Sequence, residues 1–199
     1  MMLAVLLAAA WAVGGAGERP ASGADLIGAP AKAWQLEEWE RGAPVALSEL
    51  RGRVVVVRFW TNTCPYCARS LPALESLAQE FHGRPVQFLG VYHSKPRRTE
   101  QPWAGATEKA REWGLSFPVA YDRGWRMVDA WWLQGRERVP TSPTFVIDPA
   151  GRIVHVHPGP ELHPSAEPDH RECDRAFAAL RQAIQQALGS APAPSVTNR

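Results

Sequence analysis

Two cysteines separated by two residues are the feature of this sequence with the clearest chemical meaning. Cys64 and Cys67 enclose the dipeptide Pro65-Tyr66, and this spacing is typical of a dithiol that closes to a disulfide and opens again. Cysteine reacts as the thiolate, so one thiol of such a pair attacks a partner and the other releases it. We expect Cys64 to be the nucleophile and Cys67 to resolve the mixed disulfide.

The residues around the pair predict the elements that hold it. Val54 to Val57 form a β-branched run that is long enough for a buried strand. After Cys67 the apolar residues recur at helical spacing, at Leu71, Leu74, Ala78 and Phe81. The cysteines therefore lie where a strand passes into a helix. Because unpaired amides and the helix dipole stabilise an anion at a helix start, we expect Cys64 to be a thiolate near neutral pH.

Three other interpretations of the pair are less consistent with the sequence. A zinc site needs two further ligands at a second paired spacing, and the sequence has no second C-x-x-C. A purely structural disulfide across so short a loop adds little stability. A peroxidatic cysteine is suggested by Thr61, placed before Cys64 as in peroxiredoxins, but the proline that those enzymes carry upstream is Val57 here. We favour the redox pair.

The N-terminal residues predict where this chemistry takes place. Leu3 to Val13 is an apolar run, and Ser22-Gly23-Ala24 follows as a small-residue cleavage site. A basic segment before the run is missing, and the run is short for a membrane span. We interpret residues 1–24 as a signal peptide or an N-terminal anchor. The protein is therefore expected in the periplasm or elsewhere outside the cytoplasm, soluble or anchored.

Composition limits the remaining functions. The chain has 199 residues with 22 Lys and Arg against 20 Asp and Glu, a formal net charge of +2. So small a net charge implies no strong positive electrostatic field of the kind that attracts nucleic acid, so we expect no nucleic-acid partner. Three cysteines are too few for a disulfide-stapled scaffold. Residues 25–42 are expected to lead into one domain, and the Pro- and Ala-rich residues 191–199 to be a disordered tail.

The order of predicted elements indicates an α/β protein whose central sheet is covered on both faces. The expected elements are a strand over 86–92, a loop over 94–105, a helix over 107–113, an extended segment over 117–121, a helical face with Trp125, Val128, Trp131 and Trp132, a hairpin of 144–147 with 153–156, and a last helix over 173–188.

With these motifs the chain resembles the TlpA/ResA-like group of exported thiol-disulfide oxidoreductases, which have the thioredoxin fold. Besides the cysteine pair, Pro72 matches the proline that kinks the active-site helix of thioredoxins. The segment 143–151 resembles their cis-proline strand and hairpin, and 44–52 resembles the strand and turn before the first core strand. The similarity covers residues 43–188. It implies a thioredoxin-like domain over 43–190, with a mixed central sheet flanked by helices on both faces.

The resemblance also implies partners and further site residues. Protein disulfides are the expected substrates, an upstream redox protein the expected partner, and no cofactor is required. Cytochrome c maturation is one role in this group. Pro143 is expected to be the cis-proline beside the cysteines, with Pro140 as the fallback, and Ser142 to present its backbone to the substrate. Other expected substrate contacts are Pro65, Tyr66 and Trp60.

Several residues depart from the pattern of the group. Thr63 stands where thioredoxins have tryptophan, Arg58 replaces their buried acid, and Ser70 replaces the glutamate of ResA-like proteins. No proton acceptor for Cys67 is therefore identified. We interpret Arg58 as paired with a carboxylate at the sheet surface or reaching outward, and a cation that lowers the pKa of Cys64 is the alternative. The direction of electron flow is open, because a stabilised thiolate makes the pair more oxidising, whereas ResA-like proteins are reductases.

A group of histidines near a third cysteine raises the question of metal binding. His155, His157, His163, His170 and Cys173 fall in one short segment, and such side chains suit copper or zinc. Because Cys173 begins the apolar stripe of the last helix, we interpret it as a buried small hydrophobe and expect no bound metal. Two other functions stay open: a Sco-like copper metallochaperone that uses the cysteine pair and a histidine, and a redox-inert binding module.

Overall fold

The computed structural model describes residues 22–97 and 99–190. The predicted apolar run Leu3 to Val13 and the predicted tail over 191–199 lie outside the described residues. Of the predicted cleavage site, Gly23 is buried, where a Cβ would meet Val156 and Trp132. Within the described part of the chain, no helix is both long and apolar enough to cross a membrane.

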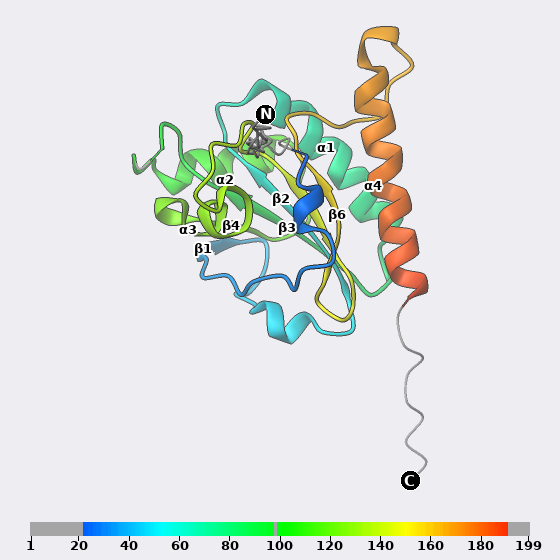
Figure 1. The fold of residues 1–199 in the computed structure, drawn as a ribbon. Helices are drawn as coiled ribbons and strands as arrows, with labels where there is room; N and C mark the ends of the chain where they lie inside the picture. The colour runs from blue at the N-terminus through cyan, green and yellow to red at the C-terminus, as the bar shows by residue number, and fades with distance from the viewer. Residues whose placement is uncertain (1–21, 98, 191–199) are drawn as a thin grey trace, which may run out of the picture.

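A six-stranded sheet in the order β1-β4-β3-β2-β5-β6 forms the centre of the molecule (Figure 1). The strands are β1 (Glu37–Glu40), β2 (Val54–Trp60), β3 (Val86–Tyr92), β4 (Val119–Tyr121), β5 (Thr144–Ile147) and β6 (Ile153–His157). The central strand β2 runs parallel to β3 and antiparallel to β5, and all of its residues are buried. A strand that is covered on both faces reads as a continuous apolar run, which explains the valines at its start.

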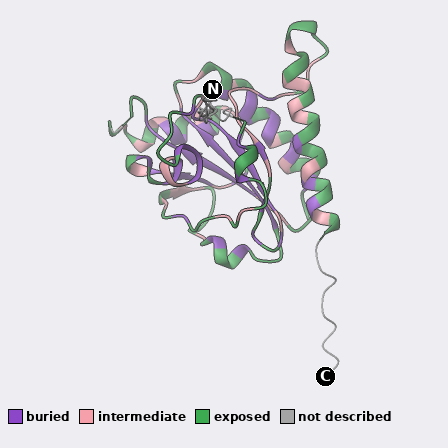
Figure 2. Ribbon diagram, in the orientation of Figure 1, coloured by how far each residue is buried: buried purple, intermediate pink, exposed green. Residues whose placement is uncertain are grey.

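Alternate residues of β2 point into two separate hydrophobic cores. Val54, Val56 and Trp60 face one core, together with leucines of the helices. The helices are α1 (Pro65–Glu80), α2 (Trp103–Glu112), α3 (Arg126–Val128) and α4 (Arg171–Gly189). Of these, α1, α2 and α4 cover this first face of the sheet, and buried residues of α4 line only the side toward the sheet (Figure 2).

The opposite face of the sheet is covered without a long helix. Val55, Val57 and Phe59 of β2 pack there against tryptophans from two distant parts of the chain. These are Trp34 from the N-terminal segment and Trp125, Trp131 and Trp132, which lie in and around α3 and the π-helical turn that follows it. Trp34 and Trp131 lie with their ring centroids 6.0 Å apart. The predicted α/β class with both faces of the sheet covered is confirmed.

The elements agree with the sequence prediction except near their ends and around Trp125, where the expected helix is divided into short 3-10, α and π turns and Trp125 has a φ of +64°. The strand over 86–92, the hairpin and the last helix are present. However, α2 begins at Trp103 rather than Thr107, and Pro102 is its N-cap. The earlier start places Ala106 in the helix, where it faces the core together with Ala110. The strand β1 lies in the expected lead-in, where it pairs with β4, and residues 47–50 form a 3-10 turn instead. The lead-in is thus part of the sheet.

Candidate active site

The structure places the two cysteines at the junction that the sequence predicts. Cys64 is the N-cap residue of α1, Pro65 occupies the first helical position, and Cys67 lies in the first turn. Proline suits that position because the first helical N–H has no partner within the helix. Cys64 is half-buried and Cys67 fully buried, and both are free thiols. Only Cys64 is therefore open to an incoming sulfur atom.

The helix start and the second cysteine both stabilise a thiolate at Cys64. Hydrogen bonding by the Cys67 thiol is the largest influence that lowers the pKa of Cys64, to about 5. The backbone amides of Cys67 and Tyr66 and the positive charge of Lys95 act in the same direction, and partial burial opposes them. These are the orphan amides of a helix N-terminus, directed at an anion. The expected low pKa of Cys64 is consistent with this geometry.

The same interactions keep Cys67 protonated. Its hydrogen bond to Cys64 and its burial both raise the pKa of the Cys67 thiol well above its ordinary value. The positive charge of Arg58 has the opposite influence and favours the Cys67 thiolate. The site therefore holds one ionised and one neutral sulfur at neutral pH, with a cation beside the neutral one.

Arg58 does not lie at a surface, so our preferred interpretation of it from the sequence is wrong. Only 1% of its surface is exposed. The guanidinium donates hydrogen bonds to Thr144 Oγ1 at 3.0 Å and to the Pro160 carbonyl at 2.6 Å. Burial lowers the pKa of Arg58, whereas the charges of Cys67 and Cys64 raise it. The alternative interpretation, a cation close to the cysteines, describes this arrangement better.

A groove opens beside Cys64. It encloses about 420 Å³. Its lining consists of Thr61, Thr63, Cys64, Pro65, Tyr66, Lys95, Val139, Pro140, Ser142 and Pro160. Tyr66 is 43% exposed and Val139 is 78% exposed, although both are apolar enough to prefer burial. Exposed apolar side chains at the rim of a groove are typical of a surface that receives a partner. The half-buried Cys64 thus lies in a groove that is open at the surface.

Comparison with known proteins identifies the family. The AhpC/TSA family matches residues 27–156, which is more than half of the chain. The chain belongs to the AhpC/TSA family. Among family relatives, it is 34% identical over 124 residues to the thiol-disulfide oxidoreductase ResA of Halalkalibacterium halodurans, a match over 62% of this chain and 64% of ResA. It is 28% identical over 133 residues to FixW of Rhizobium leguminosarum, over 65% of this chain and 59% of that protein. Both matches span less than two thirds of the relatives' length.

Solved structures confirm the thioredoxin-like fold of this AhpC/TSA protein. A Bacteroides thetaiotaomicron protein, known from its solution structure, superimposes with a TM-score of 0.64 at 23% identity, over 82% of this chain and 91% of that one. A thiol:disulfide interchange protein of the thioredoxin family from Chlorobium tepidum superimposes with a TM-score of 0.58 at 20% identity, over 82% and 97% of the two chains.

Some predicted substrate contacts of this AhpC/TSA protein lie elsewhere than expected. The peptide bond before Pro143 is not among the cis bonds, whereas the one before Pro140 is. The assignment to Pro143 is therefore wrong and the fallback holds, because Pro140 is the proline that lines the groove. Ser142 also lines it. Trp60 does not, because it is fully buried against Tyr92 and Trp113 beneath the helix start.

Thr61 and Thr63, beside the cysteine motif, and three residues far from it line the groove without having been predicted as substrate contacts. Lys95, Val139 and Pro160 come from loops that follow or precede strands far apart in the chain. Lys95 follows shortly after β3, whose carboxyl end lies beside that of its parallel neighbour β2. That register was the one available signal, since loops at the carboxyl ends of parallel strands converge. Val139 and Pro160 have no comparable sequence signal.

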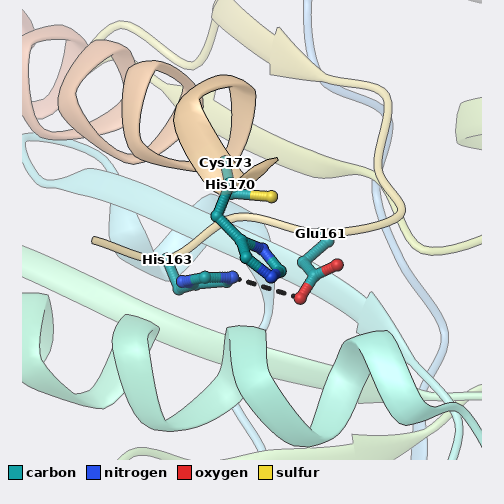
Figure 3. Close-up of side chains that lie close together, drawn as sticks. All are labelled: Glu161, His163, His170 and Cys173. Carbon is teal, nitrogen blue, oxygen red and sulfur yellow. Dashed lines mark hydrogen bonds and ion pairs between the residues drawn. The ribbon is translucent and has the colours of Figure 1, made fainter. Parts of the chain in front are cut away.

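The histidine and cysteine cluster is gathered only in part. Glu161, His163, His170 and Cys173 lie together (Figure 3), with their ligand atoms within 4.8 Å of one another. His155 and His157 of β6 are not part of this group. Cys173 is only partly buried and lines a surface pocket, so its interpretation as a core residue is wrong. The residues of α4 that pack on the core begin later, at Ala176 and Phe177, and the first buried one is Leu180. Within residues 22–97 and 99–190, neither cysteine of the C-x-x-C pair joins a group with metal-ligand geometry, as a Sco-like site would require.

Proposed function

We propose that this protein is a thiol-disulfide oxidoreductase that acts on protein disulfides outside the cytoplasm through the Cys64-Pro65-Tyr66-Cys67 pair. The observation that carries the proposal is the division of roles between the two sulfurs. Cys64 is accessible with its pKa lowered to about 5, and Cys67 is buried with its pKa raised. A low-pKa, partly exposed thiolate beside a protonated thiol is the arrangement that dithiol exchange needs.

The proposed reaction with a substrate disulfide has two exchange steps. The Cys64 thiolate attacks one substrate sulfur, the substrate S–S bond breaks, and the second substrate sulfur leaves and takes up a proton. Cys67 then loses its proton and attacks Cys64 Sγ, which forms the Cys64–Cys67 disulfide and releases the first substrate sulfur as a thiol. The substrate gains two electrons and two protons, and the enzyme becomes oxidised. An upstream dithiol partner reverses the change.

Arg58 has a defined part in the second step. Once Cys64 is bound to the substrate, it no longer carries the negative charge that keeps Cys67 protonated. The influence of Arg58, which favours the Cys67 thiolate, then acts without that opposition. We infer that Arg58 stabilises the resolving thiolate electrostatically. It is a positioning residue, because it acts through Cys67 and not on the substrate. Ser70 stands where ResA-like proteins have a glutamate, so this position supplies no carboxylate as proton acceptor.

The groove supports a peptide substrate. The exposed side chains of Tyr66 and Val139 offer apolar contacts in the groove that Cys64 lines. Ser142 supplies backbone polar groups next to Pro140. We propose that an extended segment of a disulfide-bonded protein lies along these residues. Pro65 also lines the groove.

The compartment of the protein and the direction of electron flow belong to the same proposal. The apolar run Leu3 to Val13 and the likeness to ResA support export, with the N-terminal segment as a signal peptide or anchor. Cytochrome c maturation is one role that this location allows. The stabilised Cys64 thiolate favours the reduced form of the pair and raises its reduction potential. Measuring the reduction potential of the Cys64–Cys67 couple would distinguish an oxidant, at about −120 mV, from a reductant, at about −270 mV.

Trapping of the mixed disulfide tests the proposal. Cys67→Ser retains the nucleophile but lacks the resolving thiol, so it should accumulate a covalent adduct with a reducible, disulfide-bonded test protein. The adduct should run as one higher band that reductant dissolves. The matched control is the Cys64→Ser, Cys67→Ser double variant, which retains Cys173 and should form none. Equal adduct in both variants, or full turnover by Cys67→Ser, would contradict a two-cysteine mechanism.

A further inference from the structure

Four side chains with metal-ligand chemistry meet outside the dithiol site. Glu161 and His163 lie in the loop after β6, and His170 and Cys173 lie at the beginning of α4. Figure 3 shows the two imidazole rings and the sulfur directed toward the Glu161 carboxylate. This cluster does not include the cysteine pair. The mechanism proposed above uses none of the four groups.

The spacing of the ligand atoms is close to what a tetrahedral ion requires. One carboxylate oxygen, two imidazole nitrogens and one sulfur all lie within 4.8 Å of one another. Zinc bonds of about 2.0–2.3 Å in a tetrahedron put neighbouring ligand atoms about 3.3–3.8 Å apart. Side-chain rotations that move the ligand atoms by about 1 Å therefore suffice to close the site. Four protein ligands form the closed type of site that is typical of structural zinc.

The hydrogen bonds of His163 leave a position for a cation. Its Nδ1 lies 3.0 Å from the Pro164 carbonyl oxygen, and its Nε2 lies 3.1 Å from Glu161 Oε1. A neutral imidazole has one N–H, and a backbone carbonyl is the common partner for the ring nitrogen that does not bind the metal. With Nδ1–H donated to Pro164, the lone pair of Nε2 faces a carboxylate oxygen. A cation between Nε2 and Oε1 would accept the lone pairs of both atoms.

Glu161 is held in place by Arg69. The guanidinium of Arg69 in α1 forms a two-pronged ion pair with the carboxylate, in which its Nε donates to Oε1 and its Nη2 lies 3.1 Å from Oε2. The Glu161 side chain is only 9% exposed. Ligating carboxylates are usually hydrogen-bonded by an outer partner of this kind. On metal binding Oε1 would exchange its contact with Arg69 Nε for the ion, while Nη2 retains Oε2.

The types of ligand select the metal. A thiolate and two imidazoles are poor ligands for calcium or magnesium, which prefer oxygen, and good ligands for zinc. The His163 and His170 rings already lie with centroids 4.9 Å apart. The thiolate and the carboxylate together carry two negative charges, which balance Zn²⁺. We propose that Glu161, His163, His170 and Cys173 form a zinc site that ties the loop after β6 to the first turn of α4. This proposal reverses our expectation from the sequence that the protein carries no metal.

The site would stabilise one wall of the active-site groove. Pro160, the residue before Glu161, lines the groove and accepts the hydrogen bond of Arg58. The amide of Leu162, the residue after Glu161, donates to Ser70 Oγ of α1 at 3.0 Å. A bound ion would therefore add a further attachment, to α4, for a loop that already contacts β2 and α1. The inference stands independently of whether the dithiol is catalytic.

Zinc titration of the full chain tests the site. The Cys64→Ser, Cys67→Ser background removes the dithiol, which would bind zinc by itself. In this background we expect one zinc ion per chain, and Co²⁺ in its place should give the visible d–d bands of a tetrahedral site and a thiolate-to-cobalt charge-transfer band. Adding Cys173→Ser should abolish the charge-transfer band and weaken zinc binding by more than about 100-fold, since loss of a ligand exceeds loss of an outer partner. Adding His170→Ala should weaken it similarly.

Two control variants make the outcome decisive. His82→Ala removes an exposed imidazole at the end of α1, and Glu172→Gln removes an exposed carboxylate next to Cys173. Both should retain the affinity and the cobalt spectrum of the background protein. No zinc binding by the background protein would overturn the proposal. The same holds for binding that survives Cys173→Ser and His170→Ala unchanged, or that is lost equally in the two controls.

Discussion

Arg58 of β2 donates a 2.6 Å hydrogen bond to the carbonyl of Pro160, and this bond joins the strand beneath the cysteines to the wall of the groove. The guanidinium is buried, and its positive charge favours ionisation of Cys67. A buried cation thus occupies the position where thioredoxins carry a buried acid. The consequence is a resolving thiol that is assisted by a fixed charge.

Removing this charge should slow resolution of the mixed disulfide. In Arg58→Met the pKa of Cys67 should rise further, because the positive charge that lowers it most is lost. Since the attacking species is the thiolate, we expect resolution at neutral pH to slow by roughly three- to tenfold. The Thr144 and Pro160 oxygens lose a donor, at a cost of about 1–3 kcal/mol. Stopped-flow release of a mixed-disulfide leaving group measures the rate, and urea unfolding measures the stability.

The control for that experiment is Thr144→Val. It removes one hydrogen bond of the guanidinium but retains the charge. Its resolution rate should stay near that of the parent protein, although its stability should fall. If both variants slow resolution equally, packing rather than charge explains the effect of Arg58.

The two thiols should differ in their rates of alkylation. In reduced protein the rate constant for Cys64 should rise through pH about 5 and level off by neutral pH, because its pKa is lowered to about 5. Cys67 should react more slowly at every pH below its raised pKa, and its burial adds to the difference. Mass spectrometry of peptides after timed iodoacetamide labelling separates the two. Equal rates would contradict the assignment of the nucleophile.

A buried histidine near the groove should make the protein sensitive to acid. His93 is fully buried beside Trp125 and lies 2.8 Å from the Thr141 carbonyl through Nε2, and burial lowers its pKa from 6.5 to about 4. Its neutral form is favoured by folding, so this stability is complete above pH about 6.5 and is lost as pH falls through about 4. The shift corresponds to roughly 2–4 kcal/mol.

His93→Gln tests this contribution, because glutamine retains a donor for Thr141 but does not titrate. Between about pH 7 and about pH 4.5 the variant should lose less unfolding free energy than the parent protein. Asp122, whose pKa burial raises to about 6, titrates in the same range with the opposite sign, so the two proteins must be compared with each other. The exposed His82→Gln is the control, and an acid dependence that is identical in all three proteins would contradict the prediction.

Gly159 should be required for the shape of the groove. Its φ is +88°, and a Cβ there would lie 2.7 Å from the Ser142 carbonyl oxygen and 3.0 Å from Pro140. Gly159→Ala should therefore cost about 2–3 kcal/mol and reduce binding of a peptide substrate. Gly28→Ala is the matched control, because Gly28 has a φ of +86° and nothing within 4 Å, so it should cost only about 1 kcal/mol. Urea unfolding and the KM for a disulfide peptide measure the two effects.

Local patterns in the sequence were sufficient to predict the strand and the helix that hold the two cysteines. The valines of β2 and the helical spacing after Cys67 act over a few residues, so both elements follow from them without knowledge of the fold. The C-x-x-C motif is equally local, and the proposal that Cys64 is the nucleophile starts from it. Element ends were less predictable. The helix α2 extends back to Trp103 because its alanines pack on the sheet, which is a contact with distant residues.

Everything that depends on pairing across the chain was decided by the tertiary structure. Whether Arg58 reaches a surface depends on the packing above β2, and whether Pro140 or Pro143 lies beside Cys64 depends on the path of one loop. The same holds for Cys173. The helical pattern predicted it in the core, whereas the path of the loop after β6 brings His163 within 4.8 Å of it. Sequence periodicity reports which residues share a face of an element, and only the arrangement of elements determines what that face meets.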